Sequence, residues 1–166
     1  EATDKKWKVV AIDCGAKYNI YRHLSSIGCE IVSVPNTSTV DEIKAHCPNG
    51  LFISNGPGDP AAVTSTVSTL KEIAGTIPTF GICLGHQMLA LSLGANTWKL
   101  KFGHRGTNQP VRDLETGKVE ITSQNHGFCV DEQSLLDAEC TVTHRHLNDD
   151  TVAGFKHNRL PIMGVQ

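Results

Sequence analysis

Apolar residues in the first 94 positions of the chain alternate between two spacings. Continuous apolar runs are typical of strands buried on both faces of a sheet, and a repeat of three to four residues is typical of amphipathic helices. The runs predict strands over 8–13, 29–35, 50–54 and 78–82. The helical repeat predicts helices over 18–27, 39–47, 62–75 and 85–94, of which the second could be capped by Ser38 or Thr39.

Strands and helices that alternate with short links predict an α/β fold with a mostly parallel sheet and helices on both faces. The pattern changes after Gly94, where short strand-like pieces are separated by Gly, Asn and Asp. We expect a β-rich second half, partly antiparallel and partly an extension of the sheet. It would use residues 96–101, 118–123, 127–130, 139–144, 151–157 and 161–166. No repeat or linker divides the chain, so we expect a single domain over residues 1–166.

Composition changes this picture little. The 166 residues are 39% hydrophobic and 19% charged, with a net charge of -2, as in ordinary globular proteins. Without a Lys/Arg block or an apolar run of about 20 residues, we expect neither a nucleic-acid partner nor a membrane partner. The six cysteines form no CxxC pair and favour free thiols in a reducing cytoplasm. His144 and His146 lack a nearby third ligand, so we expect a solvated strand end and no metal site.

Candidate chemistry centres on Cys83, which stands between a predicted strand and a predicted helix. Gly81 and Gly85 bracket it in a G-x-nucleophile-x-G pattern, typical of a strained strand-to-helix elbow. The glycines would permit a close approach of strand and helix, and the helix N-terminus would lower the thiol pKa. The Leu84 N–H would point to an oxyanion at the attacked carbonyl. The alternative is a small core cysteine with glycine neighbours.

A second loop, SNGPGDP over residues 54–60, also follows a predicted strand. Ligands of open α/β sheets bind beyond the carboxyl ends of the strands, so both loops should lie at one edge of the sheet. The Gly58 N–H could supply a second oxyanion donor. Taken alone, the loop is better explained as an ordinary Pro/Gly turn.

GICLGHQ (81–87) together with SNGPGDP resembles the class I glutamine amidotransferases, which take ammonia from the side-chain amide of glutamine. Three further stretches, AIDCGAKYNI (11–20), GHRGTNQPV (103–111) and ITSQNHGFCV (121–130), resemble the glutaminase domain of the carbamoyl phosphate synthetase small subunit. The resemblance covers nearly the whole chain and implies a flavodoxin-like fold.

The resemblance implies a role for each motif. Cys83 would attack glutamine and form a γ-glutamyl thioester, while the Gly58 and Leu84 N–H groups hold the oxyanion. The residues implied in glutamine binding are Gly56, Gly58, Leu84, Gln87, Asn125, Gly127 and Phe128. The domain itself would need no metal or cofactor. ATP and bicarbonate would be handled by a large synthetase subunit that accepts the ammonia for arginine and pyrimidine synthesis in the cytoplasm.

One part of the family pattern is missing from these 166 residues. The family places its base and orienting carboxylate in an H-P-E motif just after a strand whose end reads GVQ, and this sequence ends at GVQ. We therefore expect a piece cut at both ends, lacking the family's N-terminal domain, and weak or inactive as a glutaminase. His86, His104 and His126 are expected to be structural or solvated rather than a replacement base.

Three other functions remain open at this point. The chain could serve a different class I amidotransferase, of the anthranilate or GMP type. It could be a catalytically incomplete domain that only binds a partner. More distantly, it could be a hydrolase of γ-glutamyl peptides with a related elbow.

Overall fold

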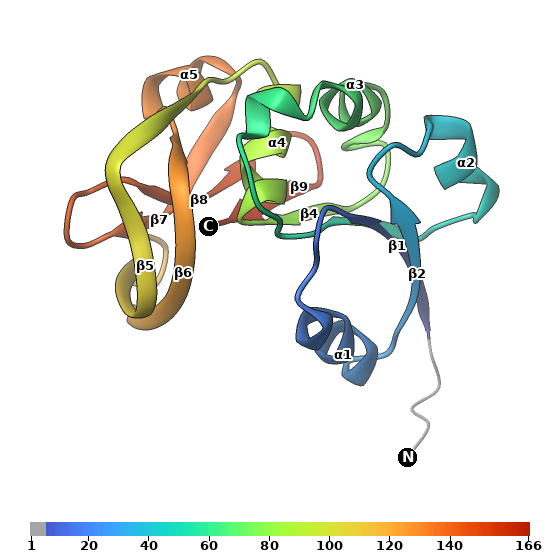
Figure 1. Cartoon of the computed structure of the whole chain (residues 1–166), viewed down its shortest axis with the longest axis horizontal. Helices are drawn as coiled ribbons and strands as arrows, with labels where there is room; N and C mark the ends of the chain where they lie inside the picture. Colours follow the sequence, from blue (N-terminus) through green and yellow to red (C-terminus); the bar gives the residue numbers. More distant parts are fainter. Residues whose placement is uncertain (1–5) are drawn as a thin grey trace.

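The computed structural model describes residues 6–166, which form one mixed sheet of nine strands flanked by helices (Figure 1). The strands lie in the order β2-β1-β3-β4-β9-β8-β7-β5-β6. Their bounds are β1 Trp7–Asp13, β2 Cys29–Pro35, β3 Gly50–Ile53, β4 Thr79–Ile82, β5 Thr97–Asp113, β6 Val119–Val130, β7 Cys140–His146, β8 Val152–His157 and β9 Ile162–Val165. The α/β prediction is confirmed.

The first five strands in this order, β2 to β9, are parallel. Their order is the flavodoxin-like one, with β9 in the last parallel position. The crossover from β1 to β2 runs toward one edge of the sheet, and the crossovers from β2 to β3, β4 and β9 run toward the other edge. Because all of them are right-handed, the first helix lies on the opposite face from the next three. Figure 1 shows α1 on one side of these strands and α2, α3 and α4 on the other. Helices cover both faces, as the sequence predicted.

The helices follow the predicted positions with small differences at their ends. Their bounds are α1 Tyr18–Ser26, α2 Val40–Ala45, α3 Thr64–Ile73, α4 Leu84–Ser92 and α5 Glu132–Asp137, with a 3₁₀ turn η1 at Pro60–Ala62. Thr39 rather than Ser38 caps α2, in a reciprocal capping box with Glu42. No helix in the described part of the chain is long and apolar enough to cross a membrane.

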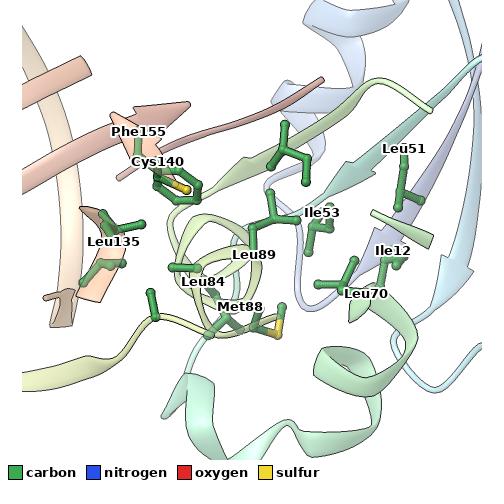
Figure 2. Close-up of a cluster of buried hydrophobic side chains, with 14 of the residues drawn as sticks. Ile12, Leu51, Ile53, Leu70, Leu84, Met88, Leu89, Leu135, Cys140 and Phe155 are labelled. Carbon is green, nitrogen blue, oxygen red and sulfur yellow. The ribbon is translucent and has the colours of Figure 1, made fainter. Parts of the chain in front are cut away.

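Helix α4 lies at the centre of the core and joins the two halves of the molecule. Its residues 84–90 are all buried, which explains its apolar character all round. In Figure 2, Leu84, Met88 and Leu89 lie between two groups of side chains. One group comes from the parallel strands and α3, and the other, including Leu135 and Phe155, comes from the second half. Both halves therefore share one core.

The second half continues the sheet through antiparallel pairs from β9 to β6. Here the structure corrects two expectations. The GHRG stretch, which lies outside the predicted strands, is part of the 17-residue strand β5, which has register shifts on either side of it. Gly103 and Gly106 adopt positive φ angles there, so the strand can bend without ending. Helix α5, capped by the Asp131 side chain, was not predicted.

Candidate active site

Cys83 occupies a strained turn between β4 and α4. Its φ of 54° lies in the left-handed region, which non-glycine residues rarely adopt. A Cβ at Gly85 would lie 2.2 Å from the Ile53 carbonyl oxygen, and one at Gly81 would lie 2.6 Å from the Gly85 carbonyl carbon. Both glycines are therefore required by backbone packing, as the elbow pattern predicted.

The SNGPGDP loop lies at the same edge of the sheet as the elbow. Ser54 follows β3, and its hydroxyl accepts a 2.8 Å hydrogen bond from the Cys14 N–H at the end of β1. A Cβ at Gly56 would lie 2.2 Å from the Cys14 carbonyl oxygen, so the two loop backbones are in close contact. Gly58 has a φ of +102° with open space around it. The carboxyl ends of β1, β3 and β4 thus meet at Cys83.

A cavity of about 410 Å³ brings most of the predicted site residues together. Those that line it are Gly56, Gly58, Cys83, Gln87, Asn125, Gly127 and Phe128. Leu84, the remaining one, is buried directly behind Cys83 at the start of α4. A second cavity of about 280 Å³ is also lined by Cys83 and shares Gly56, Pro57 and Asn125 with the first. The roles of these residues remain predictions.

Charged residues around the two cavities were not predicted from the sequence. Lys99, Arg105 and Asp59 line the larger cavity, and Lys17 lines the smaller one. Charges of both signs suit an amino acid, which carries an ammonium and a carboxylate group. Lys17 could have been found, because it follows β1 at the carboxyl edge of the sheet. Lys99 and Arg105 could not, because the bend of β5 brings them there.

Burial has the largest effect on the pKa of the Cys83 thiol. It raises the pKa of Cys83 above its ordinary value, although the Leu84 N–H, the Gln166 amide and the Lys17 charge each favour the thiolate. The expected lowering of this pKa by the helix N-terminus is therefore wrong for this structure. The stabilising groups are present, but desolvation outweighs them.

The side chain of Gln87, one turn along α4 from Cys83, links the elbow to β6. Its Nε2 donates to the Phe128 carbonyl oxygen at 2.8 Å and to Gln166 Oε1 at 2.7 Å. Phe128 belongs to the predicted glutamine-binding stretch. Gln87 therefore ties one wall of the larger cavity to the helix that follows Cys83.

Comparison with known proteins agrees with this geometry. Residues 10–166 match the family model described as glutamine amidotransferase class-I. The chain belongs to this family. In this amidotransferase chain the Cys83 elbow, the SNGPGDP loop and residues 125–128 of β6 line a shared cavity.

Two relatives narrow the comparison. The chain is 55% identical over 163 residues to the carbamoyl phosphate synthase small chain of Rhodopirellula baltica, covering 98% of this chain and 42% of that protein. It is 51% identical over 165 residues to the small chain of Staphylococcus haemolyticus, covering 99% of this chain and 45% of that protein. The amidotransferase chain thus spans less than half the length of these relatives.

A solved structure supports the fold. A glutamine amidotransferase of Thermotoga maritima superposes with a TM-score of 0.72 at 21% identity, over 96% of this chain and 74% of that one. At this level of identity the likeness concerns the fold alone. It agrees with the flavodoxin-like order of the parallel strands.

Two histidines of the amidotransferase chain lie near the elbow, and neither is placed as a base for Cys83. His86 is fully buried against Phe155, with ring centroids 5.0 Å apart, and burial lowers its pKa to about 3. His126 lines the larger cavity, but its Nδ1 lies 2.7 Å from the Phe128 carbonyl oxygen. Within residues 6–166, no histidine hydrogen-bonds the Cys83 thiol.

His146 contradicts the expectation of a solvated strand end. It is 1% exposed and stacks on His104, with ring centroids 3.9 Å apart and an angle of 6° between the rings. Asp149 lies beside both, and the three offer ligand atoms within 4.8 Å of one another. An imidazole binds a metal in its own ring plane, and two stacked rings share no such plane. As arranged, this cluster is therefore better suited to hydrogen bonding than to a metal ion.

Proposed function

We propose that this chain is the glutaminase part of a carbamoyl phosphate synthase small chain, which hydrolyses glutamine to glutamate and ammonia. The observation that carries the proposal is the strained Cys83 elbow, which faces a cavity that the SNGPGDP loop and the 125–128 stretch also line. Its relatives at 51–55% identity are carbamoyl phosphate synthase small chains.

The chemistry would proceed in two balanced steps. Cys83 Sγ bonds to the side-chain amide carbon of glutamine, the carbon–nitrogen bond breaks, and the nitrogen takes the thiol proton and leaves as ammonia. Water then attacks the γ-glutamyl thioester, which releases glutamate and restores the thiol. The Gly58 and Leu84 N–H groups would stabilise the oxyanion in both steps.

Glutamine binding is assigned to the walls of the cavity. Gly56 and Gln87 would hold the side-chain end near the elbow. Asn125, Gly127 and Phe128 would hold the amino-acid end, and Lys99, Arg105 and Asp59 add charges of both signs to this wall. Zwitterion recognition is needed, because the reacting amide is small and gives little selectivity by itself.

We also propose a partner and a compartment for the chain. A large carbamoyl phosphate synthase subunit would accept the ammonia for arginine and pyrimidine synthesis, and would carry the ATP and bicarbonate chemistry. Six free cysteines are consistent with the reducing cytoplasm.

The chain alone should be a slow glutaminase. Burial raises the pKa of Cys83, and no histidine among residues 6–166 hydrogen-bonds the thiol. General-base catalysis contributes about 100- to 10,000-fold, and that contribution would be missing.

Ammonia release from glutamine tests the proposal, together with trapping of the acylated chain by mass spectrometry. The wild-type chain should gain one γ-glutamyl group on Cys83 and release ammonia slowly, and Cys83→Ala should do neither. Cys47→Ala removes an exposed cysteine far from the elbow in sequence and should behave as wild type.

The partner is tested in the same assay. A carbamoyl phosphate synthase large chain from one of the matched species should bind the chain and stimulate ammonia release, and the synthetase components of GMP or anthranilate synthesis should not. Stimulation by one of those components instead would reassign the acceptor. Binding to the large chain with no acylation under any condition would favour a partner-binding domain without activity.

A further inference from the structure

A row of hydrogen bonds runs from the glutamine wall into the second half of the sheet. The Phe128 carbonyl oxygen lies 2.7 Å from His126 Nδ1, and His126 Nε2 lies 3.0 Å from His104 Nδ1. His104 Nε2 in turn lies 2.7 Å from Asp149 Oδ2. The three side chains come from β6, β5 and the turn between β7 and β8, and both histidines are buried.

Both ends of this row can only accept hydrogen bonds. Phe128 presents a carbonyl oxygen. Asp149 presents a carboxylate: burial raises its pKa, but the hydrogen bonds from His104 and Thr151 outweigh burial and lower it overall. His126 Nδ1 and His104 Nε2 must therefore each carry a hydrogen.

Counting protons shows what the middle of the row needs. The bond between His126 Nε2 and His104 Nδ1 requires one more hydrogen, since two bare nitrogens 3.0 Å apart would repel. The two rings then carry three ring protons, one more than two neutral imidazoles hold. Gln124 Oε1, 2.9 Å from His126 Nε2, affects which ring carries the extra proton and leaves the count unchanged.

We propose that His104 and His126 share one extra proton held by Asp149, and that this charged row positions the Phe128 carbonyl in the wall of the glutamine cavity. The effect of this row on glutamine binding rests on the proposed glutaminase function. Phe128 would be fixed from two sides, by the His126 ring and by the Gln87 amide. His104 and Asp149 would be positioning residues that never touch glutamine.

The neighbouring groups divide into those that oppose the charge and those that favour it. Burial lowers the pKa of His126 to about 4, and His104 and His146 act in the same direction, so the extra proton of the pair resides mainly on the His104 ring beside Asp149. Asp149 and the Phe128 carbonyl act in the other direction. His86 on α4 is neutral because its own pKa is about 3, and Lys99 and Arg105 line the cavity beside His126 with like charge.

His146 does not compete for the extra proton. Its Nδ1 accepts a 3.2 Å bond from the Asn148 N–H, and its Nε2 lies 3.0 Å from Gln109 Oε1. One ring proton satisfies both contacts. Burial lowers the pKa of His146 although Asp149 Oδ1 lies 3.4 Å from its Nδ1, so the ring is neutral and stacks on His104. Asp150 is engaged by Arg145 and lies outside the row.

The shared proton is tested by nitrogen NMR of the histidine rings in the wild-type chain, titrated with pH. At pH 7 the His104–His126 pair should hold three ring protons, and should lose one in a single coupled step as pH rises. The same step should weaken glutamine binding. Two singly protonated rings at pH 7 would overturn the proposal, and this measurement needs no variant that must fold.

Asp149→Asn tests the positioning, because it keeps the shape of the side chain and removes its charge. It should lower the pH at which the pair loses its proton, and weaken glutamine binding to the Cys83→Ala chain about tenfold or more by calorimetry. Asp150→Asn is the matched control: this neighbour's side chain is 82% exposed, and both readouts should stay unchanged. An Asp149→Asn chain with unaltered ring protonation and unaltered glutamine binding would refute the proposal.

The two readouts separate this inference from the proposed function. If the Cys83→Ala chain binds no glutamine while NMR finds the third proton, the glutaminase proposal fails and the shared proton stands. If glutamine binds but the rings are neutral, the shared proton alone is wrong.

Discussion

Gly85→Ala is the most direct test of how the elbow is held. Helix propensity alone would make this change stabilising by up to about 1 kcal/mol. The new Cβ would, however, lie 2.2 Å from the Ile53 carbonyl oxygen, 2.8 Å from its carbonyl carbon and 2.9 Å from its Cβ, all below the 3.0 Å that real Cβ contacts keep. Propensity and packing thus predict opposite signs.

The magnitude follows from what would have to move. The contacts are with the β3 backbone, which pairs with β1 on one side and β4 on the other, so the strand cannot yield locally. Helix α4 would have to retreat, and it is packed between both halves of the core. Overpacking of this kind costs about 1–3 kcal/mol. We expect the upper end of the range, which lowers Tm by about 6–12 °C for a domain of this size.

Thermal and urea unfolding followed by circular dichroism would measure the effect. Gly50→Ala, on the contacted strand β3, is the control. Its Cβ would lie 3.4 Å from the nearest atom, an ordinary contact. It should leave the midpoint within a few degrees of wild type. A Gly85→Ala chain that unfolds at or above the wild-type temperature would refute the packing argument and leave helix propensity as the dominant effect.

Two further predictions concern titratable groups. Alkylation of Cys83 by iodoacetamide, followed by peptide mass spectrometry, should be slow at pH 7 and still accelerate above pH 9, because burial raises the pKa of its thiol; a rate that levels off below pH 8 would contradict this. His86→Leu should shift acid unfolding to lower pH. Burial lowers the His86 pKa from 6.5 to about 3, so below pH 6.5 this histidine binds a proton in the unfolded chain but not in the native chain, which destabilises the native chain. An unchanged acid midpoint by circular dichroism would show that His86 does not govern it.

The parallel half of the fold could be predicted because its signals are local. Each of its strands before β9 is a short apolar run, and each is followed by a helix with its own spacing and stop signal. The glycine bracket around Cys83 and its position after β4 gave the elbow for the same reason. A motif within seven residues carries its own geometry.

The antiparallel half could be predicted only in part, because its geometry depends on pairing between distant residues. Strand β5 includes Gly103, Gly106 and Pro110, which sequence patterns assign to loops, yet it pairs with both β6 and β7. His104, His126 and Asp149 meet only because this pairing brings them together. No local spacing could have shown that His146 would be buried.

The raised pKa of Cys83 shows a second limit, that of assigning electrostatics from motif position. A helix N-terminus favours the thiolate, and the sequence places Cys83 there correctly. The structure adds burial, which acts on the same group with opposite sign and greater weight. An elbow thus supplies strain, placement and nearby N–H groups, but the protonation of its nucleophile depends on how much water the surrounding walls exclude.

One of those walls comes from the half of the chain that does not contain Cys83. Gln87 reaches from α4 to the Phe128 carbonyl, 41 residues away, and His126 holds the same oxygen from the other side. The β5–β6 ribbon is in turn held by the core that α4 shares with Leu135 and Phe155. Affinity for glutamine should therefore depend on the docking of the antiparallel half onto α4, and reactivity of the thiol on the elbow. Substitutions in the two regions should then separate binding from chemistry.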